Sequence, residues 1–196
     1  YYIYMNIIEI FTKSLFLIIS FDNDLWEIII LSLYVSISAL IIASIFGLLI
    51  GYYIALKNFP FKSFFLIVLN SLMGIPPVVV GLIVYFVFAS GGPFGVLQLL
   101  YTPTAMIIAQ VIIIFPIVTS LSHEIFDLNW REYKDQLRSI NMPFFGVAFI
   151  ITKHSYFLVI TALLSAFGRA ISEVGAVMIV GGNIEHFTRV MTTAIS

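Results

Sequence analysis

The stretch "SFFLIVLNSLMGIPPVVVGLIVYFVFASGGPFGVLQLLYTPTAMIIAQVIIIFPIVTSLSH", residues 63 to 123, contains no Asp, Glu, Lys or Arg. A helix crosses the hydrocarbon of a bilayer in about 20 apolar residues, so this stretch is too long for one crossing. The turn-forming residues "SGGPFG" at 90–95 divide it. The stretch therefore predicts two crossings, at 63–89 and 103–124, the second beginning after Thr102, a residue type that caps helices.

The rest of the chain is also strongly apolar. Of its 196 residues, 61% are hydrophobic and 10% are charged, which leaves too little polar sequence to coat a soluble domain. The formal charge of -1 argues against nucleic-acid binding, and the absence of cysteine excludes disulfides and thiolate metal sites. The sequence has no P-loop motif and no histidine ligand pattern, so we expect no cofactor and no bound metal. The predicted fold class is an all-α integral membrane protein, a polytopic helical bundle.

Two further crossings complete the expected bundle. The uncharged residues 28–56 predict one, and the apolar residues 155–180, ended by the "GGN" of 181–183, predict the other. The N-terminal residues 1–25 include a short stretch with Glu and Lys among apolar residues, which favours an amphipathic helix in the membrane interface. The predicted organisation is this interfacial segment followed by a transmembrane domain over 26–196.

The basic residues predict the orientation in the cell membrane. With four crossings, one side receives six of them: Lys57, Lys62, Arg131, Lys134, Arg138 and Lys153. Cytoplasmic loops carry the excess of Lys and Arg, so the loop 125–154 is predicted in the cytoplasm. Residues 181–196 then face outside, where they would line the outer mouth, meet a binding protein or form an ordinary solvated loop. A last helix is expected after Ser196.

The predicted cytoplasmic loop contains "DLNWREYKDQLRSINMPFF", residues 127 to 145. Asn129 with Glu132 fits a capping box, and Asn141 followed by a proline fits a helix end, so we predict a separate helix over 130–141. One apolar stripe runs along it, formed by Trp130, Tyr133, Leu137 and Ile140. Such a stripe either rests on the membrane surface or docks in a groove of another protein.

This loop resembles the coupling loop of ABC-importer permeases, whose pattern is E-A-A, three residues, G, and nine residues later I-x-L-P. Asp135-Gln136-Leu137 falls on E-A-A, Asn141 on the glycine and Ile151 on the isoleucine, whereas Lys153 and His154 replace L-P. The resemblance implies contact with a separate ATPase. The residues expected to make it are Trp130, Tyr133, Asp135, Leu137, Ile140 and Asn141.

Three further stretches resemble the tungstate branch of the oxoanion ABC-importer permeases: "LMGIPPVVVGLIVY" (72–85), "LLYTPTAMIIAQ" (99–110) and "FGRAISEVGAVMIVGGNIEHFTRVMTTAIS" (167–196). The resemblance implies the permease subunit of an ATP-driven tungstate importer in a prokaryotic cell membrane. It also implies a homodimer that works with a separate ATPase and an external solute-binding protein, and no enzymatic activity of its own. A molybdate or other oxoanion permease is the alternative, and a secondary carrier or channel is the alternative from another class.

Two features are candidates for the translocation path. Arg169 and Glu173 are four residues apart, so we expect an ion pair on one helix face with Ser172 nearby. Pro76 and Pro77 interrupt the second crossing, and the backbone carbonyls that they leave free suit a water-lined path. In the alternative interpretation, the pair only pins neighbouring helices and the prolines only make a packing kink.

Glycines at a spacing of four favour close contact between helices. Gly47 and Gly51 form G-x-x-x-G in the first crossing, and small residues at this spacing let two backbones approach. We expect this contact within one subunit more than between two subunits.

Overall fold

The computed structural model describes residues 12, 20 and 22–195, and its regular elements there are all helical. The interfacial helix predicted within residues 1–25 falls almost wholly outside the described residues. The elements are α2 (Asn23–Leu56), α3 (Lys62–Met73), α4 (Pro77–Phe88), the 3₁₀ turn η1 (Gly95–Leu97), α5 (Pro103–Ser139), α6 (Phe144–His154), α7 (Tyr156–Ile171), α8 (Gly175–Gly181) and α9 (Met191–Ile195). The all-α fold class is thus confirmed.

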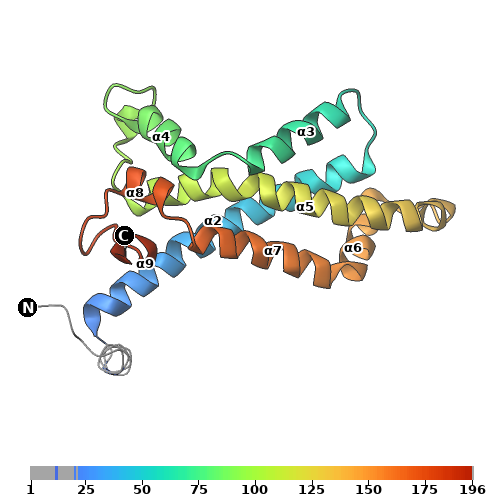
Figure 1. Ribbon diagram of the computed structural model, residues 1–196. Helices are drawn as coiled ribbons and strands as arrows, with labels where there is room; N and C mark the ends of the chain where they lie inside the picture. Colours follow the sequence, from blue (N-terminus) through green and yellow to red (C-terminus); the bar gives the residue numbers. More distant parts are fainter. Residues whose placement is uncertain (1–11, 13–19, 21, 196) are drawn as a thin grey trace, which may run out of the picture.

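The two long helices α2 and α5 form the centre of the bundle, with α3, α4, α7 and α8 arranged around α5 (Figure 1). They have 34 and 37 residues and are apolar enough to cross a membrane. A Cβ at Gly51 would lie 2.1 Å from Ser122 Oγ, and one at Gly47 would lie 2.8 Å from a Val118 methyl carbon. The predicted close contact within one subunit is confirmed, because α2 needs both glycines to approach α5.

The second predicted crossing is two half-helices. α3 and α4 meet at an angle of 97° across a break of a few residues. Pro76 is the N-cap of α4 and Pro77 its first residue, which suits a residue without an amide hydrogen. The Val79 amide in the first turn of α4 donates to the Pro76 carbonyl at 2.9 Å. The predicted interruption is confirmed.

The prediction of one helix over 155–180 is wrong. α7 ends at Ile171 and α8 begins at Gly175, and α7 is also bent by 80° from α6. The Glu173 carboxylate lies at this break and accepts a hydrogen bond of 3.1 Å from the Ala176 amide in the first turn of α8, which satisfies one of the free amides at the start of that helix. The predicted end at "GGN" is confirmed, because α8 stops at Gly181 and the next glycine has φ 73.

The half-helices α4 and α8 are in backbone contact. A Cβ at Gly81 of α4 would lie 2.7 Å from the Ala176 Cα, and one at Gly175 of α8 would lie 2.6 Å from a Val78 methyl carbon. Neither position has room for a larger side chain. α4 and α8 therefore pack on each other as closely as their backbones allow.

The predicted separate helix over 130–141 is also wrong, because α5 runs without a break from Pro103 to Ser139. Asn129 lies inside α5, where its side chain donates to the Ile125 carbonyl at 2.8 Å and caps nothing. The pair Arg131–Asp127, at 2.8 Å, follows the same continuous helical turn. The predicted end is confirmed, because Asn141 takes the left-handed conformation with φ 47.

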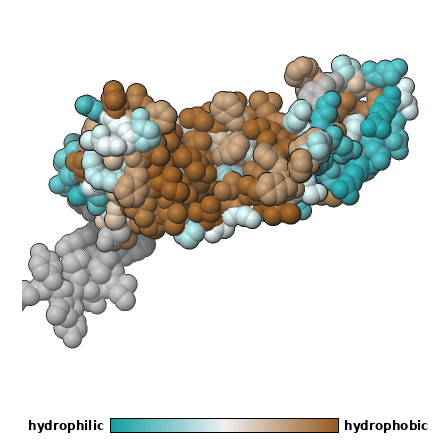
Figure 2. Space-filling view, turned by 90° about the horizontal axis from the view of Figure 1, so that it is seen from above, coloured by the Kyte–Doolittle hydropathy of each residue, from teal (hydrophilic) through white to brown (hydrophobic). Residues whose placement is uncertain are grey.

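The surface separates by polarity along the long axis. Figure 2 shows an apolar middle and a hydrophilic end, which is where α2 ends, α3 begins and α5 ends. The six basic residues that the sequence assigned to one side belong to this end, which we call the basic end. Large side chains on the apolar middle are freely exposed, for example Leu49 (62%) and Phe86 (67%), as expected where lipid or a second subunit covers them.

Candidate functional site

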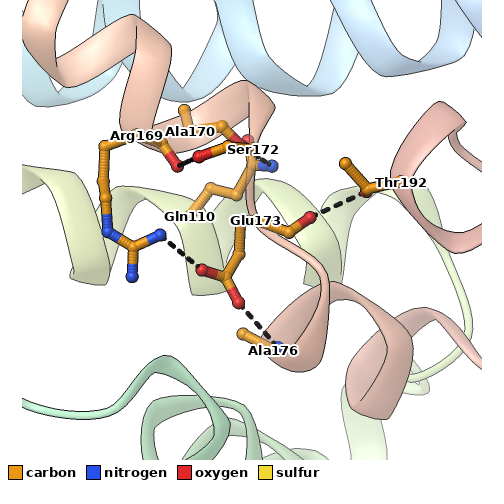
Figure 3. A network of polar contacts seen from close by, with 7 residues as sticks. All are labelled: Gln110, Arg169, Ala170, Ser172, Glu173, Ala176 and Thr192. Atoms are coloured by element: carbon orange, nitrogen blue, oxygen red, sulfur yellow. Dashed lines mark hydrogen bonds and ion pairs between the residues drawn. The ribbon is translucent and has the colours of Figure 1, made fainter. Parts of the chain in front are cut away.

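Arg169 and Glu173 meet where α7 ends and α8 has not yet begun (Figure 3). Arg169 Nη1 donates to Glu173 Oε2 at 2.7 Å, so the expected ion pair is confirmed. The pair does not lie on one continuous helix, because Arg169 is in the last turn of α7 and Glu173 is in the break that follows. The Glu173 side chain is 5% exposed, whereas that of Arg169 is 35% exposed, so the guanidinium is the accessible half.

Further hydrogen bonds hold the break in place. Thr192 Oγ1 donates to the Glu173 carbonyl at 2.8 Å, and Gln110 Nε2 of α5 donates to the Ala170 carbonyl at 3.1 Å (Figure 3). Ser172 Oγ donates to the Arg169 carbonyl at 3.2 Å. Sequence reasoning missed Gln110 and Thr192. Gln110 had a detectable signal, a lone amide inside an apolar run, whereas nothing in the sequence marked Thr192.

A cavity of about 280 Å³ lies beside Arg169, in the angle between α3, α4 and α5. Arg169 is the one charged side chain among the described residues that line it. The other lining residues are apolar: Leu72, Met73, Ile75, Val80, Val111, Ile112, Ile113, Phe115, Pro116 and Ile117. Pro76 and Pro77 do not line this cavity. Their bend places Met73 and Val80 on its wall.

A second, more open cavity of about 670 Å³ lies between α3 and α5, on the side of the basic end. Its lining is mixed: four leucine and methionine residues lie beside the polar and charged residues Asn70, Ser120, His123, Glu124, Asp127 and Arg131. Ser120 Oγ donates to Asn70 Oδ1 across it. Met73 lines both cavities, so they adjoin at this side chain. Together they form an interrupted route from Arg169 toward the basic end.

The predicted docking stripe faces the chain's own α6. Leu137 is 6% exposed and packs with Val147 and Ile151, and Trp130 and Tyr133 lie against the same cluster. α6 folds back onto this part of the stripe, so Leu137 is buried within the chain and Trp130 and Tyr133 are half-buried. The predicted contact of the stripe with the membrane or a partner stays a prediction. The remaining predicted coupling residues are exposed: Asp135, Ile140 and Asn141.

Two ring contacts lie in the same region, one between α5 and α6 and one within α5. Tyr133 stacks on His154, the last residue of α6, with ring centroids 5.2 Å apart. The Arg138 guanidinium lies 5.6 Å from the centroid of the Trp130 ring. We call residues 140–143, between these helices, the elbow. It projects beyond the packed rings, with Ile140 63% exposed.

The segment after α8 is not an ordinary solvated loop. Thr188 is 1% exposed, and its hydroxyl donates to the Gly181 carbonyl at 2.6 Å and accepts from the Ile184 amide at 2.9 Å. Met191 donates its amide hydrogen to Ser32 Oγ of α2 at 2.7 Å. The segment therefore returns into the bundle and places α9 beside the break at Glu173.

The sequence matches known transport proteins over most of its length. Residues 43–196 match the family described as binding-protein-dependent transport system inner membrane component. The chain is 40% identical to a tungstate uptake system permease protein of Peptoclostridium acidaminophilum over 190 residues, which are 97% of this chain and 83% of the relative. It is 39% identical to a probable anion ABC transporter permease protein of Haloferax volcanii, over 84% of this chain and 73% of the relative.

A more distant relative is a sulfate transport system permease protein of Escherichia coli K12, at 25% identity over 92% of this chain and 65% of the relative. Permeases of this family work with a binding protein and an ATPase, and they lie in the inner membrane as multi-pass proteins. The apolar helices of this chain agree with such a location. The chain therefore belongs to the family of binding-protein-dependent transport system inner membrane components, as its resemblance to ABC-importer permeases predicted, and is a transport subunit and not an enzyme.

Proposed function

We propose that this chain is the permease subunit of an ATP-driven tungstate importer and that the oxoanion passes Arg169. Two tungstate uptake permeases, at 40% and 32% identity, support this substrate over the sulfate relative at 25%. The observation that carries the path is the cavity in which Arg169 is the one charged lining residue described. The relative described as a probable anion permease keeps molybdate or another oxoanion as the second candidate.

The positive charge of Arg169 is unfavourable inside a bundle that spans a membrane, unless the charge has a function. An arginine in the centre of a membrane helix costs about 3 kcal/mol even on the lowest scales, and the Glu173 pair offsets part of that cost. A pair that only pinned helices would bury both partners, whereas Arg169 keeps 35% of its side chain exposed beside a cavity. The guanidinium therefore serves as the attraction for a dianion that crosses an otherwise apolar constriction.

A second copy of the chain would complete the path. The cavity beside Arg169 has walls from α3, α4 and α5, and the apolar residues on α3 and α4 beyond it are exposed, such as Ile67 (63%) and Ile83 (56%). A large exposed apolar surface marks contact with another protein or with lipid, and beside the path we assign it to a subunit interface. The proposed assembly is a homodimer with the path between its subunits.

We place the basic end in the cytoplasm, where the excess of Lys and Arg is expected. The ATPase then contacts Ile140 and Asn141 of the elbow and Asp135 in the last turns of α5, all of which are exposed. Trp130, Tyr133 and Leu137 act in coupling by holding α6 against α5. Since α5 is one helix from the Arg169 cavity to the elbow, a movement of the ATPase is transmitted along it without an intervening joint.

The test is uptake of labelled tungstate, molybdate and sulfate by vesicles that contain the permease, its ATPase and its binding protein. We expect ATP-dependent uptake with tungstate preferred. Arg169→Ala should lower uptake far more than it lowers the folded yield. Equal losses of uptake and yield would assign the residue to structure alone, and uptake by the permease alone in liposomes would support a carrier or channel instead.

A further inference from the structure

We propose that Glu173 weakens the hold of Arg169 on the transported anion, so that the anion is released instead of trapped. This inference rests on the proposed function, in which the anion passes Arg169. It concerns a residue that does not itself touch the anion but sets how strongly its neighbour does. The role follows from how the ion pair is built and from what else lines the cavity.

The ion pair leaves part of the guanidinium free. Arg169 Nη1 donates a hydrogen bond to Glu173 Oε2 at 2.7 Å. Among the described residues, the Arg169 side chain makes this one hydrogen bond. A guanidinium carries five N–H donors in a planar fork. An oxoanion in the cavity can therefore bond to the remaining edge without displacing the carboxylate.

The carboxylate is fixed where it is. Its second oxygen, Oε1, accepts the hydrogen bond of 3.1 Å from the Ala176 amide, and the Glu173 backbone accepts from Thr192 at 2.8 Å. The side chain is 5% exposed and has no solvent to swing into. Glu173 consequently stays beside Arg169 when an anion arrives, and both negative groups share one positive charge.

Charge balance in the cavity then depends on this pair alone. The other described lining residues are apolar and cannot screen or replace either group. With Glu173 ionised, an approaching dianion meets a guanidinium whose charge is largely offset. With a neutral residue at 173, it would meet an uncompensated positive charge in apolar surroundings, where electrostatic attraction is strongest.

The test uses the Glu173→Gln variant of the complete permease–ATPase complex. Glutamine keeps an oxygen that can accept from the Ala176 amide, so the helix start is retained while the charge is lost. Equilibrium dialysis of labelled tungstate against the detergent-solubilised complex, without binding protein, should show binding about tenfold tighter than in the unchanged complex. In vesicles with saturating binding protein, the same variant should take up tungstate several-fold more slowly than the unchanged complex. Tungstate preloaded inside the vesicles should inhibit uptake by the variant at a lower concentration than it inhibits uptake by the unchanged complex.

A matched control lies at the other end of the molecule. Arg189 Nη1 bonds to Glu185 Oε1 at 2.9 Å with the same spacing of four residues, and neither lines the Arg169 cavity. Glu185→Gln should leave tungstate binding by the detergent-solubilised complex unchanged in the same dialysis, since this pair lies away from the Arg169 cavity. If Glu173→Gln fails to fold, Glu173→Asp draws the charge back by one carbon and should tighten binding to a smaller degree.

The outcomes separate the two proposals. If Arg169→Gln transports normally, the path past Arg169 is wrong. If Arg169→Gln loses uptake while Glu173→Gln binds tungstate no more tightly than the unchanged complex, the path stands and the proposed role of Glu173 is wrong. Tighter binding in Glu173→Gln that is abolished in the double variant with Arg169→Gln supports both.

Discussion

Thr192, close to the end of the described chain, donates its hydroxyl hydrogen bond to the backbone carbonyl of Glu173 at 2.8 Å. The bond ties α9 to the break between α7 and α8 and fixes the residue that pairs with Arg169 (Figure 3). The position of the proposed anion contact is thus set partly from a distant segment of the sequence.

Replacement of Thr192 by valine should destabilise the protein by about 1 kcal/mol, the usual contribution of one such hydrogen bond with the shape conserved. Unfolding of the purified permease, followed by tryptophan fluorescence in detergent, measures this. Thr192→Ser keeps the hydroxyl and should lose much less. Equal losses in the two variants would mean that the methyl group and not the bond is what matters.

Gly51→Ala should destabilise the chain by about 1–3 kcal/mol, because overpacking has this cost in a close-packed contact. The new Cβ would lie 2.1 Å from Ser122 Oγ and 2.8 Å from the Thr119 carbonyl oxygen, which belongs to the backbone and cannot turn aside. Gly91→Ala is the control, since a Cβ there meets nothing within 4 Å. Folded yield and unfolding midpoints of the two variants should differ clearly.

Two charge substitutions at the basic end should have different effects. Leu137→Asp places a charge in a cluster where the side chain is 6% exposed, so the folded yield should fall. Ile140→Asp changes a side chain that is 63% exposed, so the permease should fold normally but no longer retain the ATPase on co-purification. Normal retention by Ile140→Asp would remove the elbow from the proposed contact.

The pair His186–Glu27 makes stability depend on pH. His186 Nδ1 lies 3.0 Å from Glu27 Oε2, and this hydrogen bond, with the Glu27 charge, raises the pKa of His186 above its usual 6.5. The contribution is therefore fully present below pH 6.5 and is lost as the pH rises through the raised value. Both side chains are exposed, so the effect is small.

The unfolding midpoint of the unchanged protein should therefore fall slightly between pH 6 and 8 relative to that of His186→Asn, which cannot carry the charge. A difference between the two proteins that is constant over this range would contradict the assignment of the dependence to His186.

Local signals in the sequence were enough for some helix boundaries. Pro76 and Pro77 block a helix through their own covalent geometry, and Gly182 ends α8 through a conformation that glycine adopts easily. The all-α membrane fold followed in the same way from composition. Helix ends of this kind depend on a few residues that are adjacent in the sequence, so the sequence alone predicts them.

Other boundaries depend on partners distant in the sequence. No proline marks the break at Glu173, whose backbone carbonyl accepts a hydrogen bond from Thr192, 19 residues later in the chain. Asn129 is a residue type that often starts a helix, but here it lies inside α5. Its side-chain amide therefore donates to the Ile125 carbonyl of the preceding turn. The stripe with Leu137 was predicted correctly as one apolar face, whereas its partner, α6, could not be identified from periodicity.

The contact between Gly81 and Ala176 limits how the upper part of the bundle can move. α4 and α8 touch at backbone distance, and each joins its neighbour through a few unwound residues, at 74–76 and 172–174. Any tilt of one half-helix must consequently be shared by the other. Ile75 in the first break lines the Arg169 cavity and Glu173 in the second pairs with Arg169, so a tilt shared by both half-helices would alter the surroundings of Arg169 from two sides.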